Sequence, residues 1–375
     1  MYFYVDESGH TGNNLFDASQ PSLYYGVLSS RYDINKIGEM YIPKLRKKLR
    51  VERLHAAELG NGGLASIARD LENIQSRLRL QFDFCSVAKL DHAAISFFDQ
   101  VFDQGLNPAV PWTSYWTPLR YVLLIKLSAL WDESLLKKAW GARIELNNTT
   151  AENDLVEICS ELKRRVKTLP DARSIQVISE SLDWVIKNPS KIGYNVNSKA
   201  ELLSIAPNSV GFQMVLIGIA GRIIASKTQT PIITVDQQSQ FNNSQKSLAE
   251  FYAFAKKSGQ SFKAGPGLPT PDFEGMPTTP IIFKSGFDCI GLELVDVYLW
   301  IFKRLVEKKA LATELHEIIY YMANNGRENE ISIEAISNRW EEYFKNLPNP
   351  TPDQQKSAAT LLAQQEKNRL ESMNN

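Results

Sequence analysis

The chain has 375 residues, of which 43% are hydrophobic and 22% charged, the composition of an ordinary globular protein with one or two domains. The 42 basic and 42 acidic residues cancel, which excludes a protein that coats nucleic acid through overall positive charge. No apolar run is as long as a membrane span and no signal peptide precedes the first strand, so we expect a soluble, cytoplasmic protein without membrane contact. Three widely separated cysteines, Cys85, Cys159 and Cys289, favour buried thiols in a reducing compartment over disulfides.

The first third of the chain alternates strands with helices. Residues 2–5, YFYV, are aromatic and β-branched, so they predict a strand that ends at the carboxylates of Asp6 and Glu7. Serine and glycine follow them and predict a turn. The patterning then predicts a strand at 23–28, an amphipathic helix at 34–50 with a basic end, a helical turn within 53–63 that ends at glycines, a helix at 64–77 and a strand at 80–87.

The middle of the chain is mostly helical. Apolar periodicity predicts helices at 91–104, 119–140, 151–168 and 209–226, and short strands at 144–146 and 175–178. Trp112, Tyr115 and Trp116 lie in a proline-flanked loop. They either stack on the bases of a single strand or, as is more usual for such side chains, pack in a core or an interface.

The last third repeats the opening pattern, because residues 231–236, PIITVD, predict another strand that ends in an aspartate. Glycine and proline make 258–280 a loop. The other expected elements are a helix at 244–257, a strand at 280–284, an apolar helix at 288–306 and a polar helix at 353–372.

Five carboxylates stand out from this pattern. Asp6 and Asp236 each end a predicted strand, and a strand end is a rigid place to hold a metal ligand. Glu293 and Asp296 interrupt the apolar helix at a spacing of three, so they share one face of it. Their burial is costly unless a cation or a hydrogen-bond donor meets them. Glu58, in LHAAEL, is the remaining candidate.

The blocks YVDESGHTG, RLHAAELG, IITVDQQSQF and SGFDCIGLELVD, in this order, resemble the bacterial domain-of-unknown-function 3800 family over residues 1 to about 305. That family is similar in fold to the ribonuclease H-like superfamily. The resemblance implies an α/β, ribonuclease H-like fold with a mixed central sheet in a domain over 1–345, a large helical insertion at about 90–225 and a helical or flexible tail over 346–375. Glu293 departs from the family pattern, which has glutamine there.

The resemblance also implies a catalytic site. A ribonuclease H-like fold places aspartates on its first strand and at the end of its fourth strand, and a last acidic residue on a late helix. Asp6, Asp236 and Asp296 match those places in order, and Glu58 or Glu293 would complete the site. The implied chemistry is phosphodiester hydrolysis with two Mg²⁺ or Mn²⁺ ions about 4 Å apart. Carboxylates so crowded repel one another unless metal neutralises them.

Other side chains have both a functional and a structural interpretation. Glu7 points to the opposite strand face from Asp6 and is expected to support the site or the fold. His10 and His55 either transfer a proton or occupy turns. Basic residues near the first helix, and one beside the last block, either contact phosphates or form a solvated surface. These basic residues are Lys44, Arg46, Lys47, Lys48, Arg50 and Lys284.

We therefore expect a metal-dependent nuclease. By fold analogy alone, its substrate is RNA or an RNA–DNA hybrid rather than duplex DNA, with a role in bacterial defence against foreign nucleic acid, including antiviral defence. The alternative is a catalytically silent module that binds nucleic acid or a partner protein. A third option, nucleotide hydrolysis, lacks a phosphate-binding glycine loop. A regulatory partner or a homo-oligomer stays open.

Overall fold

The computed structural model describes residues 1–9, 12–227, 230–237, 241–259, 264–270 and 273–373. The chain divides into two compact units, and each is described by itself. The sheet unit comprises Met1–Val87, Ala206–Ser261 and Asp272–Glu330, and the helical unit comprises Ala88–Ile205, Phe262–Pro271 and Ile331–Asn375. The helical segment thus ends earlier than the expected 225, and it is grouped with the C-terminal helices.

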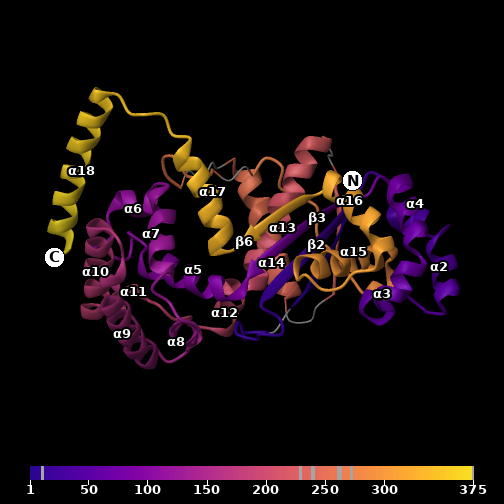
Figure 1. Ribbon diagram of the computed structural model, residues 1–375, viewed down its shortest axis with the longest axis horizontal. Coiled ribbons are helices and arrows are strands. Elements are labelled where there is room, and N and C mark those ends of the chain that lie inside the picture. The colour runs from indigo at the N-terminus through magenta and orange to yellow at the C-terminus, as the bar shows by residue number, and fades with distance from the viewer. Residues whose placement is uncertain (10–11, 228–229, 238–240, 260–263, 271–272, 374–375) are drawn as a thin grey trace. The chain divides into compact units, whose positions relative to one another are not determined.

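The protein is α/β, and a six-stranded mixed sheet organises the sheet unit (Figure 1). β1 is antiparallel to β2 and parallel to β4, and β4 is parallel to β5. The strand order is β5-β4-β1-β2-β3-β6. The strands are β1 (Tyr2–Ser8), β2 (Ser22–Ser30), β3 (Gln81–Ala88), β4 (Ile232–Asp236), β5 (Ile282–Lys284) and β6 (Arg327–Ile331).

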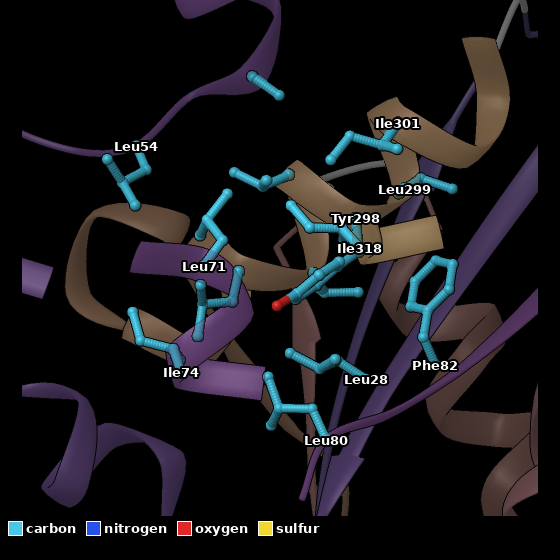
Figure 2. Packing of buried hydrophobic residues seen from close by; sticks show 14 of the residues in the cluster. Leu28, Leu54, Leu71, Ile74, Leu80, Phe82, Tyr298, Leu299, Ile301 and Ile318 are labelled. Carbon is cyan, nitrogen blue, oxygen red and sulfur yellow. The ribbon is translucent and has the colours of Figure 1, made fainter. Parts of the chain in front are cut away.

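Helix α15 (Ile290–Val306) packs on one face of this sheet against β1, β2 and β4. Its side chains Tyr298, Leu299 and Ile301 join Leu28 and Phe82 of the strands in a continuous apolar core (Figure 2). Each apolar side chain buried in this way contributes about 1.5–3 kcal/mol. The core continues into α1 (Ile34–Gly38), α2 (Ile42–Leu49), α3 (Ala56–Ser66), α4 (Ala68–Leu78), η3 (Thr313–Leu315) and α16 (His316–Asn325).

Helix α13 (Pro207–Ser226) lies on the other face, against β2 and α14 (Asn242–Ser258). The Tyr25 ring packs against α13 at Gly211, and the Tyr25 hydroxyl donates to the carbonyl of Asn208 at 3.0 Å. Because neighbouring strand residues point to opposite faces, Gly26 lies on the α15 side instead.

Among the described residues, α13 is the one helix long and apolar enough to cross a membrane, with 20 residues and a mean hydropathy of 1.5. The sequence-based expectation that no run approaches this length is therefore wrong. Half of the helix's apolar window is buried inside the protein, and a core helix of a soluble protein passes the same test.

Two expected helices near the carboxylates differ from the prediction. The helix expected at 34–50 is two helices, because Pro43 at the start of α2 lacks an amide donor and its ring clashes with a preceding helical turn. The segment 53–63 does not end at its glycines, since α3 continues through them. It bends at Gly60, whose φ of 59° a glycine adopts without strain.

The described part of the helical unit is entirely helical apart from its loops. The expected helix at 119–140 divides after Ser128 and restarts where Asp132 caps the next helix. The strands expected at 144–146 and 175–178 are wrong. Ile144 is the last residue of α8 and the next two residues belong to the loop after it, whereas 175–178 lies within α10, which buries apolar residues at a helical period. The helices are α5 (Lys89–Val101), α6 (Trp112–Trp116), α7 (Leu119–Ser128), α8 (Glu133–Ile144), α9 (Asn148–Arg165), η1 (Val166–Thr168), α10 (Ala172–Lys187), α11 (Pro189–Ile192), α12 (Lys199–Ile205), α17 (Ile333–Lys345) and α18 (Pro352–Met373).

The C-terminal helix α18 is anchored within this unit. The Arg369 guanidinium is 5% exposed, donates to the carbonyl of Ala109 at 2.9 Å and pairs with Glu180 and Glu366. Of the expected stacking residues, Tyr115 is buried beneath Arg120. For Tyr115, packing in the core is therefore the interpretation that fits, rather than stacking on a base.

The contact between α15 and β1 gives a testable prediction. A Cβ on Gly291 would lie 2.3 Å from the Tyr4 ring, so Gly291→Ala must displace the helix or the ring. Overpacking costs about 1–3 kcal/mol, and the better helix propensity of alanine returns about 1 kcal/mol. We expect a lower urea midpoint for Gly291→Ala. The matched control is Gly218→Ala in α13, where a Cβ meets nothing within 4 Å, and we expect it to be neutral or stabilising. A midpoint for Gly291→Ala at or above that of Gly218→Ala would contradict the close packing.

Candidate functional site

A cavity of about 280 Å³ lies where the carboxyl ends of β1 and β4 meet α15 and the start of α3. We call it the carboxylate cavity, because five of its described lining residues carry carboxylates and Arg53 is the one arginine or lysine among them. The lining residues are Asp6, Glu7, Ser8, Arg53, Leu54, His55, Ala57, Asp236, Gly286, Leu292, Glu293, Asp296, Leu299 and Trp300.

Asp6 is the carboxylate with the least favourable surroundings. It lies on β1 opposite Gly26 of β2, on the face that α15 covers. Burial raises the pKa of Asp6 well above its usual value, and the nearby carboxylates of Asp296 and Asp236 raise it further. The amide of Glu7 donates to Asp6 Oδ1 at 2.8 Å and offsets only part of this effect.

Asp236 ends β4 next to β1, as the sequence pattern predicts. Burial raises its pKa, while the backbone amides of Gln237 and Gly286 and the charge of Arg53 act in the opposite direction. The guanidinium of Arg53 lies 4.3 Å above the centre of the exposed Phe287 ring, so this cation is held beside Asp236 on an aromatic surface.

Asp296 accepts two contacts from the start of α3. The amide of Ala56 donates to Asp296 Oδ2 at 2.8 Å, and His55 Nδ1 lies 3.2 Å from the same oxygen. The other ring nitrogen of His55 lies 3.9 Å from Glu58 Oε1. Glu58 itself has a side chain that is 72% exposed, and it does not line the cavity.

Glu293 is occupied by structural contacts. Its side chain is almost fully buried and pairs with Arg46 through both carboxylate oxygens. The amide of Leu54 donates to Glu293 Oε2 at 2.7 Å. Burial raises the pKa of Glu293, and Arg46 and this amide counteract that effect. Glu293 therefore ties α2 and the segment before α3 to α15.

The structure thus brings Asp6, Asp236, Asp296, Glu293 and His55 to one cavity. In the positions that the structure gives their side chains, the described residues contain no group of three or more histidines, cysteines or carboxylates that could hold a metal ion.

The other predicted residues are spread more widely. Two amide hydrogen bonds of 3.0 Å from Asn208 hold Glu7 on the α13 side of the sheet, as its place in the strand implies. His10 lies outside the described residues. Lys48 binds the carbonyl of Ser66 and the carboxylate of Asp70. Exposed basic side chains occur at Lys44, Lys47, Arg50 and Lys284.

Sequence reasoning did not single out Arg53 or the contact between Ser8 and Lys303. Ser8 Oγ accepts from Lys303 Nζ at 3.0 Å, and burial lowers the pKa of Lys303. Lys303 follows Asp296 by two helical turns, so the spacing could have placed both on one face. Arg53 directly precedes LHAAEL, the segment that contains Glu58.

Comparisons of the chain with protein families, with curated proteins and with solved structures find no match, so its function is argued from geometry.

The contacts of Glu293 predict a contrast in stability. Glu293→Ala leaves Arg46 and the Leu54 amide without their acceptor, and removing one partner of a buried pair costs about 3–5 kcal/mol. Because Arg46 is partly exposed, we expect about 2–4 kcal/mol in urea unfolding. The exposed Glu58→Ala should change stability by less than about 0.5 kcal/mol. Equal effects of the two substitutions would contradict the structural role of Glu293.

The pKa shift of Asp6 predicts a pH dependence in the presence of chelator. Because the folded-state pKa is raised, the folded protein binds this proton more tightly than the unfolded chain. The stability that Asp6 contributes is complete below its ordinary pKa of 3.8 and is lost as the pH rises through the raised value. Asp6→Asn should therefore become more stable relative to the wild type as the pH rises above about 4. Urea midpoints across this range measure the difference, and a constant difference would contradict the shift.

Proposed function

We propose that the protein is a divalent-metal-dependent nuclease with a ribonuclease H-like fold. The observation that carries the proposal is the convergence of Asp6, Asp236 and Asp296 on one cavity. They come from the first strand, the end of the fourth strand and a late helix that packs on the sheet, which is the order that the resemblance implies.

The charge of the cavity fits a metal ion. Asp6, Asp236 and Asp296 line the cavity with one arginine, Arg53, among its described lining residues, and the pKa of Asp6 is raised by burial and by the other two aspartates. A bound cation would offset this repulsion, and Mg²⁺ and Mn²⁺ prefer oxygen ligands. Asp6, Asp236 and Asp296 would hold the metal ions, with small movements of their side chains. When bound, such ions activate water and stabilise the leaving oxygen of a phosphodiester.

The remaining side chains of the cavity fit roles around the phosphate. His55, oriented by Asp296, carries a second ring nitrogen directed toward Glu58 and could transfer a proton. Arg53 offers a guanidinium to a phosphate oxygen while it stays on the Phe287 ring. Glu293 would act by positioning, because its contacts hold the segment that carries Arg53 and His55.

The substrate we propose is RNA or the RNA strand of a hybrid, and the proposed setting is bacterial defence in the cytoplasm. The exposed basic side chains of Lys44, Lys47 and Arg50 on and beside α2 offer phosphate contacts next to the segment that carries Arg53. A regulatory protein or a second copy of the chain remains a proposed partner.

The test is cleavage of labelled single-stranded RNA, single-stranded DNA and hybrid duplex with Mg²⁺, Mn²⁺ or chelator. We expect metal-dependent cleavage that falls more than about 100-fold in Asp6→Asn, Asp236→Asn and Asp296→Asn, because even partners of metal ligands contribute 10- to 100-fold. Asp353→Asn, an exposed carboxylate in the first turn of α18, is the control that should retain activity.

Two results would contradict the proposal. Cleavage that survives all three substitutions would remove the carboxylate cavity from the reaction. Absence of cleavage together with tighter nucleic-acid binding by the neutralised variants would favour the silent binding module, since carboxylates repel phosphates.

A further inference from the structure

A second cavity, of about 320 Å³, lies at the end of the sheet opposite the carboxylates. Its lining comes from the starts of β1, β3 and β6, the end of β2 and the last turns of α13. We call it the arginine cavity, because four of its nine lining residues are arginines. The lining residues are Met1, Arg31, Tyr32, Arg79, Gln81, Arg222, Ala225, Ser226 and Arg327.

One of the four arginines is fixed in place. Arg222 is 6% exposed, pairs with Asp83 through two nitrogens and donates to the carbonyl of Asn325 at 3.2 Å. Asp83 balances its charge. Arg222 therefore forms a rigid wall of the cavity without adding net charge to it.

The other three arginines supply the excess charge. Arg31, Arg79 and Arg327 are exposed, and none of them forms an ion pair with a described carboxylate. Arg79 has a left-handed conformation at the end of α4, and Arg327 Nη1 lies 2.8 Å from the position of a Cβ on Gly221 in α13. All three line the same cavity, where their like charges repel each other, so the cavity favours an anion.

A simpler interpretation is that the arginines cap the carboxyl end of α13, where unpaired carbonyls attract cations. The contacts do not support this. The amide of Lys227 bonds to the carbonyls of Ile223 and Ile224, and the Ser226 hydroxyl also donates to that of Ile223. Within the described residues, Arg31, Arg79 and Arg327 bond to none of these carbonyls, so their donors are available to a ligand.

We propose that the arginine cavity binds an anion with two or more phosphate groups, from a nucleoside triphosphate or a free polyphosphate. Guanidinium groups bind phosphate through paired hydrogen bonds, and donors on several elements suit several phosphates. The Tyr32 ring, 42% exposed, offers a stacking surface for a base.

This site is separate from the proposed nuclease centre. Met1, directly before β1, and Asp6, within it, are five residues apart, so the two cavities are about 17 Å apart along the direction of β1. The proposal therefore stands whether or not the protein cleaves nucleic acid.

The experiment is calorimetric titration of the full chain with tripolyphosphate, with a nucleoside triphosphate and with inorganic phosphate, in chelator so that no metal complicates the binding. We expect tripolyphosphate to bind more tightly than inorganic phosphate. Arg79→Gln and Arg327→Gln should each weaken it about tenfold, because each removes charge-assisted hydrogen bonds to a phosphate. The matched control is Arg69→Gln, an exposed arginine of α4 outside the cavity, which should bind as the wild type does.

Comparison of these ligands distinguishes a site for a nucleoside triphosphate from a site for a free polyphosphate. Tighter binding of the nucleoside triphosphate than of tripolyphosphate, with the difference lost in Tyr32→Ala, identifies a nucleotide site, and equal binding identifies a polyphosphate site. No binding of tripolyphosphate at 1 mM (roughly −4 kcal/mol), or equal weakening by Arg69→Gln, overturns the proposal. Binding of a single-stranded oligonucleotide alone, dependent on Arg79 and Arg327, also overturns it and assigns the cavity to a polymer backbone.

Discussion

The carboxylate cavity depends on the close approach of α15 to β1. Gly291 makes this approach possible, since any side chain at that position would collide with Tyr4. On the neighbouring strand Gly26 plays the same part, because a Cβ there would lie 3.2 Å from the Cβ of Leu299 in α15. The helix can therefore carry Asp296 to the strand that carries Asp6. A longer distance between helix and sheet would leave the carboxylates in separate, solvated positions.

The close approach of α15 to β1 brings carboxylates together, and these carboxylates have different partners. Glu293 receives a guanidinium and a backbone amide, so its burial is compensated and it strengthens the fold. Asp6 receives one amide and two neighbouring carboxylates, so its burial is not compensated. A buried charge left in this condition lowers stability, and proteins retain such groups mainly where function requires them. The contrast separates a positioning residue, Glu293, from a candidate ligand, Asp6.

The sequence predicted the features of the site that depend on neighbouring residues in the chain. A strand period followed by a carboxylate identified the ends of β1 and β4, and the spacing of Glu293 and Asp296 placed them on one face. The partners of these carboxylates were not predictable, because Glu293 meets Arg46 across 247 positions in the chain. Short apolar runs were ambiguous for the same reason, since tertiary packing decides between helix and strand at 175–178.

The zero net charge of the chain conceals a separation of charge along the sheet. Acidic groups gather where β1 ends, and unpaired arginines gather where it begins. A phosphate that approaches the carboxylate cavity is repelled unless a cation is already bound there, so binding of the proposed substrate at that end would be coupled to metal. A phosphate at the arginine cavity needs no metal, and a metal bound to its phosphate oxygens would compete with the guanidinium groups. The two ends of one sheet would therefore respond to divalent metal in opposite directions, and a comparison of binding with and without chelator reports on each end separately.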